Sequence, residues 1–400
     1  MKLNSEPDRD PLADLSSYDA SVRSAAIPAA VRLLESGRLA PESGPRPWLN
    51  LHLHTFHSFH CLDWSPARAV LECRRLGLRC AGTVDFDTLA GLEETFAAGR
   101  AFGLPVLTGF ESRVFVAEYR DRVLNSPGEP GIYYFCGLGF TVRPDPASAA
   151  GRFLAGLKET AQARNRKVID RLNRFLGRIT LNYREDLLPL TPSANPTERH
   201  IILAYLRKAE TLLAGETDRF WAGVLGVGPE ETAALRQASP AAFQERLRSR
   251  LVKRGGPGYI EPEERDFPRL EEVAAATRAA GGRPVATWLD GTSPGEADPD
   301  QWLDFFIARS LEAVAIIPER NWNLKDPEEK RRKVANLEQF LAACRRRDFP
   351  VLCGTEMNRS GQPPVDDFSR PELAGHLDYF LASAGRFLPE LAGRQPEEKA

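Results

Sequence analysis

Short apolar runs alternate along the chain with longer stretches in which apolar residues recur every three or four positions. The run at 48–53 is followed by a helical pattern that Ser65 caps and Pro66 opens, and that ends near Gly77. Repeated alternation of this kind predicts a parallel sheet or barrel of about seven β-α units. The expected strands are 48–53, 81–84, 106–107, 113–117, 131–140, 284–289, 313–317 and 350–353.

The alternation is interrupted once, between 146 and 257, where the pattern is almost wholly helical. A single interruption favours a barrel with an inserted subdomain over two separate folds. Within the insertion, the arginines from Arg164 to Arg174 are expected to form a solvated helix face. The expected parts are an N-terminal arm (1–47), the first part of the barrel (48–145), the helical insertion (146–257), and the second part of the barrel with C-terminal helices (258–400).

Composition narrows the class of protein. The 400 residues carry a formal net charge of -2 and are 42% hydrophobic, which is typical of a folded globular protein without a global field for nucleic acid. The six cysteines form no CxxC pair, so neither a zinc ribbon nor a disulfide framework is indicated. No run has the length and apolarity of a signal or a membrane span. We expect a cytoplasmic protein without a membrane or nucleic-acid partner, and its oligomeric state stays open.

Four of the six histidines fall within the ten-residue segment LHLHTFHSFH, which begins at Leu51. His52 and His54 project from one face of the expected strand, because side chains alternate, so both imidazoles can reach one metal ion. His60, in the following loop, could complete such a site. The alternative is that these histidines only line a polar groove.

Carboxylates end the next two expected strands. Asp85 and Asp87 follow an apolar run in VDFDT, where they could be ligands or equally a helix cap. Glu111 ends the next strand in GFE and could bridge two cations. Successive strand ends would then offer His, Asp and Glu to one rim, which is where barrel enzymes keep their active sites.

These segments resemble the PHP (polymerase and histidinol phosphatase) superfamily. The run HLHTFHSFH matches the pattern HxHTxxSxH, and VDFDTLAGLEE and LPVLTGFES match the strand ends that follow it. Order and spacing agree over 48–111, and the likeness is thinner beyond. The resemblance implies an α/β fold, a distorted seven-stranded TIM-like β/α barrel of PHP type, which binds two or three divalent metal ions and hydrolyses phosphoesters.

The resemblance also implies roles for single residues. His52, His54 and His60 match histidine ligands, Glu111 matches the bridging carboxylate, and Asp85 matches the acidic residue of the second motif.

Several positions depart from the family pattern. Phe86 stands where the family has a ligand histidine, and Asn358 stands where its last motif ends in histidine, although Glu356 keeps a carboxylate there. A strand expected to supply a further histidine has Tyr134 and Phe135. An AHP-like element is replaced by Ala286, Thr287 and Trp288. Because imidazoles are lost, we expect one or two ions, with manganese or magnesium favoured by the oxygen donors and zinc or iron as alternatives.

Phosphate ligands are expected from two polar segments. PTERHIILAYL resembles the R-x-H element of some PHP phosphatases and offers Arg199 and His200, although an exposed helix start explains these residues equally well. The loop after Asn358 adds Gln362, Asp366 and Asp367, as substrate contacts or as a plain surface turn.

The expected function is a metal-dependent phosphoesterase that acts on a small phosphorylated metabolite or a nucleotide through a metal-activated water. The alternatives are a barrel that has lost catalysis and serves as a binding or scaffold module, and a one-metal barrel enzyme of different chemistry. The expected metal ligands are His52, His54, His60, Asp85, Glu111 and Glu356; the expected catalytic residues are His52, His54, Asp85 and Glu111; the expected substrate-binding residues are Arg199, His200 and Asn358.

Overall fold

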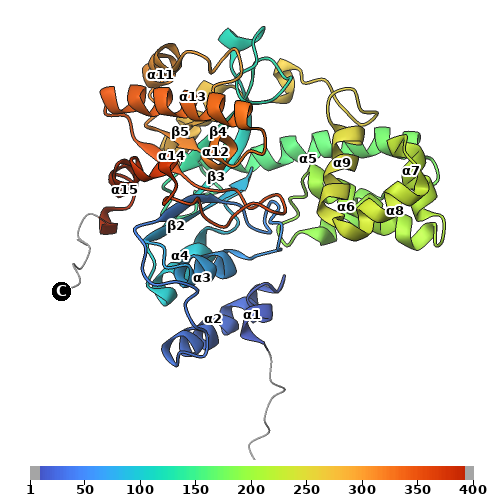
Figure 1. Ribbon diagram of the computed structural model, residues 1–400, viewed down its shortest axis with the longest axis horizontal. Coiled ribbons are helices and arrows are strands. Elements are labelled where there is room, and N and C mark those ends of the chain that lie inside the picture. Colours follow the sequence, from blue (N-terminus) through green and yellow to red (C-terminus); the bar gives the residue numbers. More distant parts are fainter. Residues whose placement is uncertain (1–9, 392–400) are drawn as a thin grey trace, which may run out of the picture.

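The computed structural model describes residues 10–391 as a nearly closed seven-stranded barrel surrounded by helices (Figure 1). This is the barrel that the sequence predicted. The strands follow one another around the barrel in chain order: β1 (Leu49–Leu53), β2 (Cys80–Phe86), β3 (Val106–Phe115), β4 (Ile132–Leu138), β5 (Arg283–Trp288), β6 (Ala313–Ile316) and β7 (Val351–Cys353).

Hydrogen bonds join β1 to the segment that follows β7. Asn50 Nδ2 donates to Thr355 Oγ1 at 2.7 Å, and the backbone N–H of His54 donates to the Glu356 carbonyl at 3.0 Å. Gly354 permits this approach, because a Cβ there would lie 2.6 Å from the His52 nitrogen. The end of β1 and the segment after β7 are thereby brought together.

Helices between the strands cover the barrel, and the hydrophobic core of the barrel fills the space between them. Over residues 10–391, every helix is too short or too polar to cross a membrane. The N-terminal helices are α1 (Pro11–Asp14) and α2 (Ala20–Glu35); the helices that surround the barrel are α3 (Pro66–Arg75), α4 (Leu92–Phe102), α10 (Leu270–Ala279), α11 (Pro299–Ala308), α12 (Glu319–Trp322), α13 (Pro327–Arg346), α14 (Pro371–Ala374) and α15 (Leu377–Gly385).

The expectation that all strands are parallel is wrong for β4, which runs antiparallel to both β3 and β5. The link 116–131 contains a 3-10 turn and no crossover helix, so the chain returns beside β3 in the opposite direction. The two short strands expected at 106–107 and 113–117 are likewise one continuous strand, β3. These differences place Cys136 of β4 directly opposite Glu111 of β3.

Five of the six α-helices between β4 and β5 form a group beside the barrel (Figure 1). Their own hydrophobic cluster includes Leu172, Tyr205 and Trp221. The long α5 joins this cluster to the barrel, since Leu154 belongs to the barrel core and Leu172 to the insertion core. With 28 residues, α5 is about 42 Å long. The five helices are α5 (Ala149–Leu176), α6 (Glu198–Leu212), α7 (Thr217–Leu225), α8 (Pro229–Ala238) and α9 (Pro240–Val252).

The loop before α6 returns to the barrel mouth. Asn195 Nδ2 donates to the carbonyls of His57 at 3.1 Å and Phe86 at 2.7 Å, and Thr191 Oγ1 donates to the Phe56 carbonyl at 3.2 Å. These bonds hold the insertion at the carboxyl ends of β1 and β2, next to the clustered histidines.

Candidate metal centre

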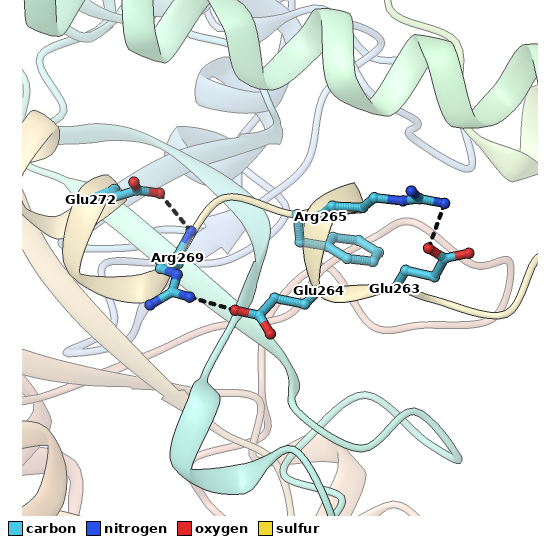
Figure 2. A pocket seen from close by; sticks show the side chains of 6 residues that line it. Glu263, Glu264, Arg265, Arg269 and Glu272 are labelled. Atoms are coloured by element: carbon cyan, nitrogen blue, oxygen red, sulfur yellow. Dashed lines mark hydrogen bonds and ion pairs between the residues drawn. The ribbon is translucent and has the colours of Figure 1, made fainter.

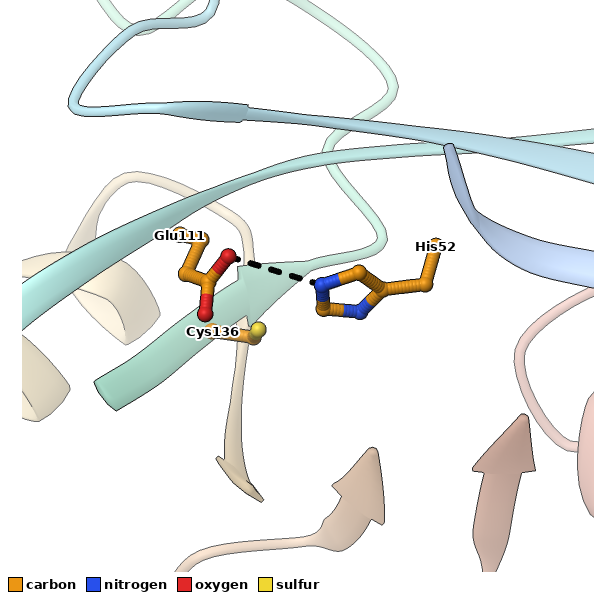
Figure 3. A group of neighbouring side chains, drawn as sticks. All are labelled: His52, Glu111 and Cys136. Carbon is orange, nitrogen blue, oxygen red and sulfur yellow. Dashed lines mark ion pairs between the residues drawn. The ribbon is translucent and has the colours of Figure 1, made fainter. Parts of the chain in front are cut away.

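Four strands bring potential metal ligands to one point inside the barrel mouth. His52 and His54 come from the end of β1, and each Nε2 lies 3.5 Å from Glu111 Oε2 of β3. Cys136 of β4 faces the same group (Figure 3). Glu356, just after β7, completes a second set with the two histidines. In each of the sets His52–Glu111–Cys136 and His52–His54–Glu356, the ligand atoms lie within 4.8 Å of one another.

Several atoms of this cluster make no hydrogen bond although they are buried. His52 Nδ1 and Nε2, His54 Nε2 and Glu111 Oε2 accept or donate no hydrogen bond. Buried polar groups without partners cost about 1–3 kcal/mol each, so such a concentration needs a ligand to satisfy it. Nitrogen, oxygen and sulfur donors from this set suit a divalent metal ion. The residues present therefore fit a metal centre.

A hydrogen-bonded chain fixes the tautomer of His54. Ser58 Oγ donates to Asp85 Oδ1 at 2.7 Å, so the Ser58 oxygen is free to accept from His54 Nδ1 at 3.3 Å. The Nε2 atom of His54 then presents its lone pair to the cluster. Burial, reinforced by the charge of His52, lowers the pKa of His54 to about 3, and this keeps the ring neutral.

Asp85 is placed as a support for ligands. Its carboxylate accepts from the Thr55 backbone N–H, from Thr55 Oγ1 and from Ser58 Oγ, each at 2.7 Å. These partners account for both oxygens, and Asp85 belongs to neither ligand set in residues 10–391. Its role as a metal ligand stays a prediction.

Arg320 holds Glu356 in place. The guanidinium contacts both carboxylate oxygens, at 3.0 and 2.9 Å, and Gln362 Nε2 donates to Glu356 at 3.3 Å. Burial alone would raise the pKa of Glu356, but the charge of Arg320 and the nearby histidines outweigh it and lower this pKa to about 2. Glu356 is thus an anion at the edge of the cluster over the physiological pH range.

His60 has a different environment from the other two predicted histidine ligands. Its Nδ1 accepts from the Leu62 N–H at 3.0 Å, which leaves the proton of the neutral ring on Nε2, and the ring stacks on Trp64 with centroids 4.6 Å apart. A protonated Nε2 has no lone pair for a metal. In this tautomer the Nε2 atom offers no lone pair, and the role of His60 as a metal ligand stays a prediction.

Phe86 and the segment with Thr287 and Trp288 stand where the resemblance led us to expect histidine ligands. Phe86 stacks on His54 with ring centroids 4.5 Å apart. Trp288 is fully buried and stacks on Phe340 at 4.2 Å. Thr287 hydrogen-bonds with Asn125 at 2.7 Å. This side of the barrel mouth is packed.

Two residues of the cluster were not singled out by the sequence. Cys136 was one of six scattered cysteines, and it became a candidate ligand through its antiparallel pairing with Glu111. The pKa of its thiol is raised well above the usual value by burial and by the charges of Glu111 and Glu356. Arg320 carried no motif. Its only signal in the sequence was its place directly after the sixth strand.

The expected phosphate ligands are partly used within the protein. Arg199 pairs with Glu245 at 2.6 Å and lies over the Phe59 ring. His200 Nδ1 accepts from the Thr197 N–H at 3.0 Å and so helps to cap α6. Asp366 is buried and accepts from the Trp322 indole, which places it beneath the surface. Substrate binding by Arg199, His200 and Asn358 stays a prediction.

Two hollows lie outside the cluster. One, about 530 Å³, is lined by charged groups that pair among themselves, Arg265 with Glu263 and Arg269 with Glu264 (Figure 2). The other, about 450 Å³, lies between the histidine loop and the insertion, and its lining includes His60 and His200. The second hollow adjoins the histidine segment.

Comparison with known proteins identifies the fold. No family model and no curated protein matches the chain. A protein from Bifidobacterium adolescentis, provisionally described as a metal-dependent phosphoesterase, matches with a TM-score of 0.50 and 21% identity, over 83% of this chain and 97% of that one. An amidohydrolase from Chromobacterium violaceum, with bound sulfate and no metal, matches with a TM-score of 0.51 and 16% identity, over 82% and 96%. This chain is similar to both in fold, and at these identities the likeness extends no further.

Proposed function

We propose that this protein is a divalent-metal-dependent phosphoesterase acting on a small phosphorylated metabolite or nucleotide. The observation that carries the proposal is the set of buried, unpartnered ligand atoms on His52, His54 and Glu111. Their place at the carboxyl ends of barrel strands is where barrel enzymes perform catalysis. The similarity in fold to a protein described as a metal-dependent phosphoesterase agrees with it.

A divalent ion bound here would supply a water of lowered pKa and would neutralise charge that develops on the phosphoryl oxygens. The chain itself orients the ligands. Ser58 and Asp85 hold His54 in one tautomer, and Arg320 keeps Glu356 ionised and fixed. Arg199, which pairs with Glu245 at 2.6 Å, is kept as a candidate phosphate ligand.

The donor set supports one or two ions. The set with Glu356 offers two imidazoles and a carboxylate, and the set with Cys136 adds a thiol. Thiolate ligands favour zinc or iron over manganese and magnesium. We therefore place zinc and iron ahead of the manganese or magnesium that the sequence favoured.

The activity is tested with a panel of phosphomonoesters and nucleotides, with the full chain supplied with zinc, iron or manganese. We expect hydrolysis of at least one phosphoester, and a loss of at least about a hundredfold in Glu111→Gln. Glu230→Gln, an exposed change on α8, is the matched control and should keep full activity. Full activity in Glu111→Gln would place the reaction elsewhere.

A second candidate function is a barrel without catalysis that binds a phosphorylated ligand. Phe86, stacked on His54, favours it, because a ring without donor atoms takes the place of a ligand. Such a protein would be stabilised by phosphate or nucleotides in a thermal-shift screen and would hydrolyse none of them.

A further inference from the structure

Basic side chains gather between the barrel mouth and the insertion. They come from β3, α5, α6, α9 and the residue that follows α9. Within residues 10–391 these five cations form ion pairs with three glutamates, and Asp266 also acts on Arg164, so positive charge remains in excess. We call this group the basic cluster; its cations are Arg113, Arg164, Arg199, Arg248 and Lys253, and its anions are Glu129, Glu198 and Glu245.

The basic cluster begins on the same strand as the candidate metal centre. Arg113 follows Glu111 by two positions on β3, so the two side chains lie on one face of the strand. On β4, Tyr134 lies opposite Arg113 and Cys136 lies opposite Glu111, so these two residues are also two positions apart on one face of their strand. Two residues of an extended strand span about 7 Å. Arg113 is therefore one step farther along the barrel mouth from the metal ligands.

Several individual N–H groups of the cluster's arginines have no acceptor. Arg113 Nε, Arg164 Nη1 and Arg248 Nε are buried and have no hydrogen-bond partner in the described chain. Arg113 pairs with Glu129, and Arg248 with Glu198 at 3.3 Å, which still leaves these donors unused. Unused guanidinium donors in a partly dry site are suited to a phosphate or carboxylate.

Crowding of like charges is visible within the cluster. Burial lowers the pKa of Arg164 and of Lys253. The charge of Arg113 lowers both pKa values further, and the charge of Arg248 lowers the pKa of Lys253. The expectation of a solvated arginine face is wrong for Arg164, which is 15% exposed and lies 3.8 Å from Glu129. It turns inward because α5 packs along the barrel and brings this part of its surface to Glu129.

We propose that the basic cluster binds a second anionic group of the substrate, a phosphate or a carboxylate, about 7 Å beyond the phosphoester at the metal centre. This inference rests on the proposed function and names its substrate class: a phosphoester that carries another anion, such as a sugar bisphosphate or a phosphorylated hydroxy acid. The glutamates of the cluster position the cations, and the excess positive charge is neutralised by the ligand.

Binding is tested by calorimetric titration of inorganic pyrophosphate into the full chain, both as purified and after chelator treatment. We expect the chelator-treated wild type to bind, and Arg113→Gln and Lys253→Gln each to weaken binding about tenfold, since a charge-assisted hydrogen bond is lost. Arg143→Gln removes an exposed arginine that pairs with Glu93 and should change nothing. Absence of binding, or equal affinity in all variants, overturns the inference.

Lys253→Gln keeps the test decisive if Arg113→Gln does not fold, because the Lys253 side chain is 44% exposed. A kinetic arm compares a sugar bisphosphate, a phosphorylated hydroxy acid and a sugar monophosphate. A higher kcat/KM for one of the first two, lost in Lys253→Gln, supports the inference and identifies the second anion. Equal kcat/KM for all three overturns it. If none is hydrolysed, the proposed phosphoesterase fails, while the titration still decides whether the basic cluster binds an anion.

Discussion

The two sides of the barrel mouth differ in how their polar groups are satisfied. On the side of β1 and β3, His52, His54 and Glu111 are buried with ligand atoms that have no partner. On the side of β5, Thr287 hydrogen-bonds with its neighbours and Trp288 stacks on Phe340 with ring planes 7° apart. Four such atoms gather in one ligand cluster on the first side, whereas on the β5 side the indole Nε1 of Trp288 is a single buried atom without a hydrogen-bond partner in the described part of the chain.

This difference indicates what became of the missing histidines. At two positions where the chain departs from the pattern it resembles, Thr287 hydrogen-bonds with Asn125 and Phe86 stacks on His54, so other side chains occupy the space. Where ligand residues are kept, the protein bears the cost of unsatisfied groups. Unsatisfied polar groups destabilise the protein, and apolar packing could replace them. We expect such a cluster of groups to be kept only where a bound ion satisfies them. The account therefore assigns metal binding to one side and stability to the other.

The largest effect on stability is expected for Trp288→Ala. Removing this fully buried ring should lower the free energy of unfolding by about 3–5 kcal/mol, because a cavity replaces its stack with Phe340. Chemical denaturation measures the loss, and elemental analysis at low temperature measures retained metal. Metal loss equal to that of a ligand variant would contradict the division between the two sides.

Ser58→Ala tests the side of the barrel mouth that holds the ligands, because Ser58 supports the ligand His54. Without the hydroxyl, His54 Nδ1 loses its acceptor and the tautomer is no longer fixed, so metal affinity should fall roughly 10–100-fold. Competition with a chromophoric chelator measures the affinity. Ser383→Ala, a buried serine bonded to the Val351 N–H, is the control and should leave the affinity unchanged.

Cys136→Ser sharpens the assignment of the metal. A thiolate favours zinc over manganese, so replacing sulfur by oxygen should reduce the preference for zinc by about tenfold. Competitive loading followed by elemental mass spectrometry gives the ratio. Cys344→Ser changes a buried thiol on α13 and provides the matched comparison. An unchanged ratio in Cys136→Ser would remove this residue from the ligand set.

A smaller effect is expected for Asp366, on the pH dependence of stability. Burial and the charge of Glu319 raise the pKa of its carboxyl to about 8 from 3.8. Between these values the folded protein holds a proton that the unfolded chain has released, so stability should fall as pH rises from about 4 to about 8. Asp366→Asn should flatten this slope in thermal melts, whereas the exposed Asp378→Asn should not.

Much of the barrel and part of the cluster could be predicted from the sequence. The alternation of strands and helices gave the order of elements, and His52 with His54 on one strand face was visible from period-two spacing. Glu111 was found from its place at a strand end and Glu356 through the resemblance, and the structure brings both to the histidines.

Other features depended on pairing between distant segments. The antiparallel direction of β4 decides that Cys136, not Tyr134 or Phe135, lies opposite Glu111, and no local pattern fixed that register. Arg320 acquires its role only because β6 and β7 lie side by side. The basic cluster joins residues from 113 to 253 across the insertion, so composition could not reveal it.

The most direct test of the account is the metal content of the purified full chain, measured by elemental mass spectrometry beside the His52→Ala/His54→Ala double variant. The account predicts about one to two equivalents of a divalent metal in the wild type, and none in a double variant that still folds. A folded wild type that neither contains nor takes up zinc, iron or manganese would contradict it, as would a double variant with unchanged metal content.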